Sequence, residues 1–297
     1  MTLSEKDQRY LWHAYTQHKT SDTPIAIVKG KDALLWDENG NTYIDAIASW
    51  WVNPYGHSNE RLARRAYEQL TYLEHVLFGG FTHQPACDLA EALLKILPKN
   101  QSKVFFSDNG STAVEVAVKI ALQYYYNRGE KRTTFIAFEE AFHGDTFAAM
   151  AVSGISLYTT AFQDQLLKVV RIPIPEKGQE EACKQRLLEV IAQEKCAAFI
   201  FEPLVLGAAG MRMYAPEVLD ELIQICREHQ VLTIADEVMT GFGKTGKTFA
   251  CDYLKQMPDM ICLSKALTGG TIPLSATTTT EAIYEAFYSD DISKALF

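Results

Sequence analysis

The chain has 297 residues, of which 47% are hydrophobic and 22% charged, with a formal net charge of −9, a composition typical of a globular protein with one large domain or two smaller ones. The acidic balance argues against nucleic acid as a partner, and no apolar run is long enough to span a bilayer. The six cysteines are scattered without a C-x-x-C pair and the N-terminus has no apolar signal, so we expect reduced thiols, no bound metal and a cytoplasmic protein.

The first hundred residues combine short strands with helices. Residues 25–47 predict a small antiparallel meander, because apolar stretches flank a turn signal at residues 38–41. Residues 59–76 and 85–97 have helical periodicity. This part therefore predicts a small α+β segment.

From about residue 100 onwards, short apolar runs alternate with amphipathic helices. We expect helices at 111–126, 180–195 and 216–230, the last with Pro216 in its first turn. The predicted strands are 103–108, 133–138, 168–172, 197–204, 231–236, 259–264 and 273–280. This alternation is typical of a largely parallel α/β sheet covered by helices on both faces.

Residues 241–248, Gly-Phe-Gly-Lys-Thr-Gly-Lys-Thr, match the phosphate-binding loop of nucleotide hydrolases. A strand precedes them, but only about two or three turns of helix fit before Pro258, where a long helix should follow. Asp236 and Glu237 would place negative charge where phosphates bind, and no later strand ends in an aspartate for magnesium. We therefore interpret the match as accidental, with Lys247 as the residue to mutate in testing an ATPase.

Asp236 ends one predicted buried strand, and Lys265 follows the next predicted strand along the chain. In a parallel sheet both side chains would lie at the carboxyl edge, where open α/β sheets bind ligands. An ordinary ion pair is the alternative interpretation.

A third element at this edge is the start of the helix at Gly110 and Ser111, with Thr112 and Glu115 spaced as a capping box. Free N–H groups and the positive end of the helix dipole can bind a phosphate there, and glycine allows close backbone approach. A capped helix without a ligand is the alternative.

A phosphate site, an aspartate and a lysine at one edge are what pyridoxal 5′-phosphate requires. The lysine amine would form a Schiff base, and the carboxylate would keep the pyridine nitrogen protonated, so that the ring can accept electrons. Phe142 offers a flat cover for the ring, with His143 beside it. A core position is the alternative for this aromatic residue.

The segments "ADEVMTGFG" and "LSKALTGG" resemble the class III pyridoxal-phosphate aminotransferases of fold type I. The resemblance covers nearly the whole chain. It is also carried by "LWHAYTQ", "ASWWVNPYGH", "VLFGGFTHQPA", "FHGDTF", "GMRMYAPE" and "SKALTGGTIPLSATTTT". It implies an α/β fold with a mostly parallel seven-stranded sheet covered by helices and a small α+β N-terminal segment.

The resemblance also implies a domain organisation. Residues 1–58 would form an N-terminal segment at the active-site entrance, and residues 59–297 the large cofactor-binding domain. Family members continue into a small C-terminal domain that these residues lack, so we expect a fragment of a longer enzyme. The family forms homodimers with shared active sites, and we expect a homodimer for the full-length form.

By the same resemblance, Lys265 is the Schiff-base lysine and shuttles the proton between the substrate Cα and the cofactor carbon. Asp236 pairs with the pyridine nitrogen, and Gly110 and Ser111 bind the phosphate. A desolvated amine next to a cationic ring is also suited to titrate near neutral pH.

The doubled tryptophan distinguishes the chain from ornithine- and γ-aminobutyrate-type relatives. Similarity is strongest to members that move an amino group from S-adenosylmethionine to 8-amino-7-oxononanoate in biotin biosynthesis. It implies that Trp50 lines the substrate pocket with Trp51 beside it, and that Tyr15 contacts the keto substrate and stacks on adenine. Core packing is the alternative for each of these aromatic residues. It is weaker for the adjacent pair of tryptophans, because strand neighbours point to opposite faces.

Two positions depart from the family pattern. Phe142 stands where a tyrosine is usual, so stacking is kept but a hydroxyl contact to substrate is lost. Lys244 stands where many relatives have arginine. Two other interpretations stay open: another ω-aminotransferase with a different amino donor, such as lysine, or an inactive fragment that binds the cofactor.

Overall fold

The structure is a computed structural model that describes residues 1–154 and 157–297. It divides into two compact units, one formed by Met1–His75 with Gly269–Thr271 and the other by Val76–Thr268 with Ile272–Phe297. The predicted domain boundary between residues 58 and 59 stays a prediction.

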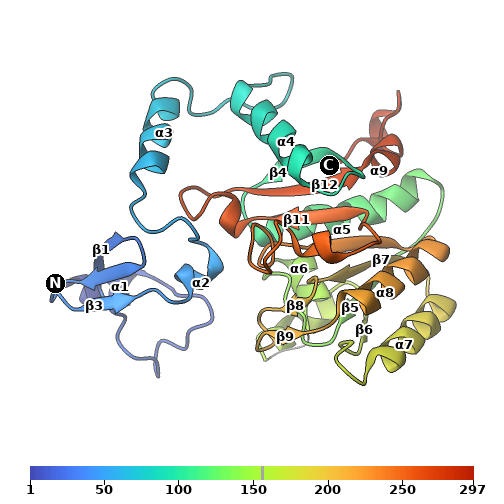
Figure 1. Cartoon of the computed structure of the whole chain (residues 1–297), viewed down its shortest axis with the longest axis horizontal. Coiled ribbons are helices and arrows are strands. Elements are labelled where there is room, and N and C mark those ends of the chain that lie inside the picture. Colours follow the sequence, from blue (N-terminus) through green and yellow to red (C-terminus); the bar gives the residue numbers. More distant parts are fainter. Residues whose placement is uncertain (155–156) are drawn as a thin grey trace. The chain divides into compact units, whose positions relative to one another are not determined.

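The first unit contains the predicted antiparallel meander. Its strands pair in the order β1-β2-β3, and the carboxylate of Asp37 accepts the N–H groups of Asn39 (2.9 Å) and Asn41 (2.8 Å) in the turn before β3. The elements of this unit are α1 (Leu3–Tyr10), β1 (Ile27–Lys31), β2 (Leu34–Asp37), β3 (Thr42–Ile44), α2 (Ala48–Trp51) and α3 (Glu60–Leu70) (Figure 1).

The α2 segment is not an ordinary helix. Ala48, Ser49, Trp50 and Trp51 all have positive φ angles, of 49°, 48°, 65° and 67°. They form one left-handed turn, a conformation that costs L-residues about 1–2 kcal/mol each. The alternation of strand neighbours therefore does not apply to the two tryptophans, because the backbone coils at this point.

The second unit contains a seven-stranded sheet with the order β4-β12-β11-β10-β7-β5-β6. All neighbours from β11 to β6 pair in parallel, and β12 runs antiparallel to both β11 and β4. This confirms the predicted mostly parallel sheet. The strands are β4 (Gln101–Ser107), β5 (Thr134–Phe138), β6 (Val169–Ile172), β7 (Cys196–Phe201), β10 (Leu232–Asp236), β11 (Met260–Leu263) and β12 (Ser275–Thr280), with a separate pair β8 (Val205–Leu206) and β9 (Arg212–Met213).

Helices cover both faces of this sheet (Figure 1). Along β5, Phe135 and Ala137 pack with α5 and α6, whereas Ile136 and Phe138 pack with α7 and α8. Burial on both faces explains why the strands are continuously apolar rather than alternating. The helices are α4 (Gln84–Ile96), α5 (Gly110–Asn127), α6 (Phe147–Val152), α7 (Glu180–Gln193), α8 (Pro216–Glu228) and α9 (Glu281–Glu285).

Four short 3-10 turns complete the described secondary structure: η1 (Thr160–Gln165), η2 (Ala250–Tyr253), η3 (Lys265–Leu267) and η4 (Ile292–Lys294). Within residues 1–154 and 157–297, no helix has both the length and the hydropathy needed to cross a membrane.

Candidate active site

Asp236 and Lys265 lie at the same edge of the sheet, as the sequence predicted. Strands β10 and β11 are parallel neighbours with Asp236 opposite Cys262, and Lys265 begins the η3 turn directly after β11. The carboxyl ends of parallel strands are the usual ligand-binding edge of an open α/β sheet.

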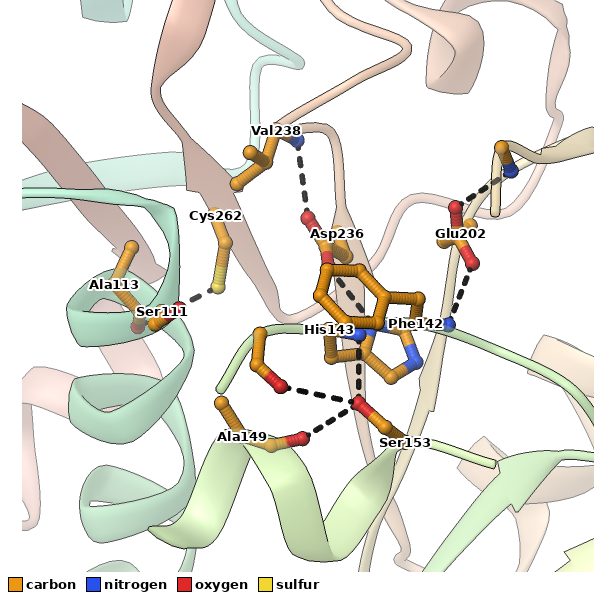
Figure 2. A network of polar contacts seen from close by, with 12 residues as sticks. Ser111, Ala113, Phe142, His143, Ala149, Ser153, Glu202, Asp236, Val238 and Cys262 are labelled. Atoms are coloured by element: carbon orange, nitrogen blue, oxygen red, sulfur yellow. Dashed lines mark hydrogen bonds and ion pairs between the residues drawn. The ribbon is translucent and has the colours of Figure 1, made fainter. Parts of the chain in front are cut away.

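Asp236 is buried and its carboxylate is held at both oxygens (Figure 2). Oδ2 lies 2.7 Å from Nδ1 of His143, and Oδ1 accepts the N–H of Val238 at 3.0 Å. His143 is also buried, and its Nε2 atom has no hydrogen-bond partner among the described residues. The carboxylate therefore has a fixed direction, and the histidine keeps one ring nitrogen available.

Ser153, which is not among the predicted site residues, holds the backbone of His143. The backbone N–H of His143 donates to Oγ of Ser153 at 2.9 Å, and that hydroxyl donates to the carbonyl of Ala149 at 2.8 Å (Figure 2). A lone serine after a short helix carries no sequence signal, because its role depends on the fold around it.

Glu202 is not among the predicted site residues either. It is buried, and its carboxylate accepts the N–H of Phe142 at 3.0 Å and the N–H of Gly207 at 2.9 Å, so it positions the residue beside His143. Burial raises the pKa of Glu202, against the opposing effect of His143. A charged residue directly after the buried strand 196–201 was the available signal.

Burial lowers the pKa of the Lys265 amine. The charges of Asp236 and Glu202 act in the opposite direction, and Lys244 adds to the lowering. Lys265 also has a positive φ of 46°, a strained conformation for a non-glycine residue. A lysine with a lowered pKa is suited to act as a nucleophile and a base.

Helix α5 starts at Gly110 as predicted, but its capping differs from the prediction. Asn109 is the N-cap and forms a capping box with Thr112, which is already helical. The predicted box between Thr112 and Glu115 is therefore wrong. Glu115 instead accepts the N–H groups of Ala148 (2.7 Å) and Ala149 (3.3 Å) in the first turn of α6.

The first turn of α5 fits a phosphate. Neither Gly110 nor Ser111 uses its backbone N–H in a hydrogen bond within the described part of the chain. The Ser111 hydroxyl donates to Oδ1 of Asp145 at 2.9 Å and accepts the N–H of Asp145 at 3.2 Å. A Cβ on Gly110 would lie 2.7 Å from Cγ1 of Val238, which leaves room only for glycine.

We predict that Gly110→Ala weakens pyridoxal-phosphate binding about tenfold, because overpacking against Val238 costs about 1–3 kcal/mol and displaces the first turn. Titration of the cofactor's visible absorbance would measure the change. The double variant Gly110→Ala/Val238→Ala removes the clash and should recover most of the affinity. An unchanged affinity in the single variant would contradict the predicted cradle.

Gly241–Thr248 is not a phosphate-binding loop. The four-residue turn η2 follows it instead of a long helix, and the Glu237 carboxylate accepts the N–H groups of Ala250 (3.1 Å) and Cys251 (2.7 Å) there. Lys247 donates to the carbonyl of Asp252 at 2.8 Å. A carboxylate thus occupies the helix start that a phosphate would need, in agreement with the sequence-based interpretation.

The predicted site residues divide between the two units. Lys265, Asp236, Phe142, His143, Gly110 and Ser111 belong to the second unit, and Tyr15, Trp50 and Trp51 to the first. Tyr15 and Trp50 pack edge to face, with ring centroids 6.3 Å apart, and both are exposed. This is the geometry of an open aromatic surface rather than of a packed core.

The arrangement in the second unit fits pyridoxal phosphate on three counts. A buried carboxylate with a fixed direction suits a protonated pyridine nitrogen, a helix start with free N–H groups suits the phosphate, and a partly buried amine with a lowered pKa suits the carbonyl. Phe142 is the residue directly before His143 in the chain. Its ring is exposed and is suited to stacking on a flat ligand.

Comparisons with known proteins agree with this arrangement. The model of the family "Aminotransferase class-III" matches residues 15–295. Enzymes named adenosylmethionine-8-amino-7-oxononanoate aminotransferase are similar to the chain: that of Synechococcus elongatus is 47% identical over 94% of this chain and 68% of its own length, and that of Staphylococcus aureus 39% identical over 97% and 68%.

Solved structures show the same relationship. The enzyme of that name from Methanocaldococcus jannaschii superposes with a TM-score of 0.94 at 39% identity, over 99% of this chain and 69% of its own. An omega transaminase from Pseudomonas jessenii in complex with PMP has a TM-score of 0.89 at 31% identity, over 96% and 67%. The chain belongs to the class III aminotransferases.

Proposed function

We propose that the protein moves an amino group from S-adenosylmethionine to 8-amino-7-oxononanoate, giving 7,8-diaminononanoate in biotin biosynthesis. The buried Asp236 and the partly buried Lys265 at one sheet edge support the transaminase chemistry of this pyridoxal-phosphate-dependent family. The names of the relatives, at 39–47% identity, support these two substrates. The predicted homodimer and the predicted cytoplasmic location stay predictions.

Pyridoxal phosphate, when bound, supplies a carbonyl that exchanges with amines and a ring that accepts the electron pair of a substrate C–H bond. We propose that Asp236 faces the ring nitrogen and keeps it protonated, with His143 fixing the direction of the carboxylate. The N–H groups of Gly110 and Ser111 would bind the phosphate. Phe142 would cover the ring.

Lys265 would hold the cofactor and then carry the proton. Its amine has a lowered pKa, so a larger share of it is neutral near pH 7 than of an ordinary lysine. The Lys265 amine would serve as the base that takes a proton from the substrate carbon and delivers it to the cofactor carbon.

Trp50, Trp51 and Tyr15 are proposed to bind the substrates. Aromatic walls suit the aliphatic chain of 8-amino-7-oxononanoate, and a flat ring suits adenine. A sulfonium over an aromatic face would contribute about 0.5–2 kcal/mol. The alternative amino donor, lysine, has neither the adenine nor the sulfonium.

The test of the proposed function is product formation by the purified, cofactor-loaded protein. We expect 7,8-diaminononanoate, detected by mass spectrometry, when S-adenosylmethionine and 8-amino-7-oxononanoate are both supplied. Product formed with lysine and not with S-adenosylmethionine would establish the alternative donor. Bound cofactor without product from either donor would favour an inactive fragment.

We predict that Phe142→Tyr is tolerated, because a tyrosine ring keeps the same stacking surface and the exposed position has room for a hydroxyl. The expected result is a kcat within about threefold of the original and an equal or lower KM for 8-amino-7-oxononanoate. Phe142→Leu, which keeps the volume and loses the flat ring, is the matched comparison. A complete loss of activity in the tyrosine variant would contradict the proposed stacking.

A further inference from the structure

The left-handed turn of residues 48–51 is the most strained segment of the first unit. Four successive non-glycine residues have positive φ there, and two of them are the tryptophans of the proposed substrate site (Figure 1, α2). A single left-handed residue is common in turns, but a run of four is not, since each Cβ lies close to the following carbonyl. Something in the structure must hold this conformation.

Asp45 provides that support. Its Oδ1 accepts the backbone N–H of Ser49 at 2.8 Å, and its Oδ2 accepts the Ser49 hydroxyl at 2.7 Å. The same Oδ2 lies 2.8 Å from Nε2 of His57, whose other ring nitrogen lies 3.0 Å from Nδ2 of Asn53. The carboxylate thus joins the middle of the turn to the chain that leaves it.

The Asp45 carboxylate is well shielded and ionised. Its side chain is only 7% exposed. Desolvation acts to raise its pKa, but the hydrogen bonds from Ser49 and His57 outweigh this effect and the pKa of Asp45 is lowered. A shielded carboxylate with three donors gives short, directional contacts of the kind that over-determine a strained backbone.

We propose that Asp45 is a positioning residue for substrate recognition: it holds residues 48–51 in the left-handed turn and thereby sets the directions of Trp50 and Trp51. This inference rests on the proposed function, in which these tryptophans contact the substrates. We assign Asp45 no contact with the substrates or with the cofactor. Its effect is on affinity, through the aromatic surface that the turn carries.

A general loss of stability is the competing explanation, and Asp37 is the matched control for it. Asp37 is a carboxylate of the same unit, and it accepts hydrogen bonds from Asn39, Asn41 and Tyr43. It organises the turn before β3, which carries neither tryptophan. Loss of this carboxylate should weaken the unit without redirecting the two rings.

The experiment compares Asp45→Asn, Asp37→Asn, Ser49→Gly and the double variant Asp45→Asn/Ser49→Gly as cofactor-loaded full-length chains. In Asp45→Asn an amide nitrogen replaces Oδ2 and cannot accept from Ser49 or His57. Glycine at position 49 adopts the left-handed conformation without steric cost, so it should keep the turn without the carboxylate. Initial rates and hydrogen exchange by mass spectrometry are the two measurements.

We expect Asp45→Asn to raise the KM for both substrates roughly tenfold while kcat changes by less than about threefold, because ground-state contacts are displaced. The peptide covering residues 46–54 should exchange faster in this variant. Ser49→Gly should stay close to the original, and the double variant should recover most of the KM. Asp37→Asn should change exchange only around its own turn.

Three results would overturn the proposal: a KM within twofold of the original in Asp45→Asn, an equal rise in Asp37→Asn, or no recovery in the double variant. Absence of turnover in the unmodified protein counts instead against the proposed function. In that case the exchange rates of the 46–54 peptide still decide whether Asp45 holds the turn, and unchanged exchange in Asp45→Asn refutes it.

Discussion

Replacing Lys265 with alanine is expected to abolish amino transfer, with a fall in rate of about 10⁴-fold or more. The substitution removes the amine that we propose both holds the cofactor and moves the proton, at the start of the turn after β11. Rates with S-adenosylmethionine and 8-amino-7-oxononanoate, measured at saturating pyridoxal phosphate, would give the size of the loss.

Lys247→Ala is the control for this experiment. Lys247 belongs to the glycine-rich loop and donates to the carbonyl of Asp252, outside the proposed chemistry. Its replacement should leave the rate within about threefold of the original. Appreciable turnover by Lys265→Ala would remove the basis of the proposed mechanism. Loss of turnover in Lys247→Ala with retained activity in Lys265→Ala would point back to the nucleotide-binding motif.

Asp236→Asn is expected to lower kcat by about 10²–10³-fold while leaving some cofactor bound. An uncharged amide cannot keep the ring nitrogen protonated, so the ring loses most of its capacity to accept electrons. The proposed phosphate contacts at the start of α5 would stay unchanged, so we expect part of the cofactor binding to be retained. Single-turnover rates with S-adenosylmethionine would separate the chemical step from cofactor loss.

Asp236→Glu would separate the effect of the negative charge from the effect of its position. It keeps the charge but moves it along a longer side chain, away from the 2.7 Å contact with His143. We expect partial activity, between that of the original and that of the asparagine variant. Activity of Asp236→Asn equal to that of the unmodified protein would refute the role given to the carboxylate.

Much of the candidate cofactor site could be predicted, because the order of the strands in the sheet determines where its residues lie. Once residues 231–236 and 259–264 are assigned to parallel neighbouring strands, Asp236 and Lys265 must end at one edge. The start of α5 at Gly110 followed from helical periodicity alone. These inferences need only local patterns and the regular geometry of a parallel sheet.

The supporting contacts were not predictable in this way. Ser153 and Glu202 act through backbone groups that folding brings near. No local pattern marks Ser153, and the signal for Glu202 is its charge next to a buried strand, which does not say which groups it binds. The capping of α5 was misassigned because the spacing of Thr112 and Glu115 fits a capping box, whereas the extended backbone of Asn109 makes that residue the N-cap. The left-handed turn at Trp50 depends on Asp45, and β propensity alone predicts an extended chain there.

The position of β12 in the sheet has a consequence for how the protein folds during synthesis. This strand lies between β4 and β11, and Ser107 pairs with Ser275, which is 168 positions later in the chain. A ribosome must therefore complete almost the entire described chain before β4 finds its partner. Until then β4 presents an unpaired edge, and such long-range closure is slow and prone to aggregation. We expect nascent chains that end before residue 275 to depend on chaperones far more than chains that reach residue 280.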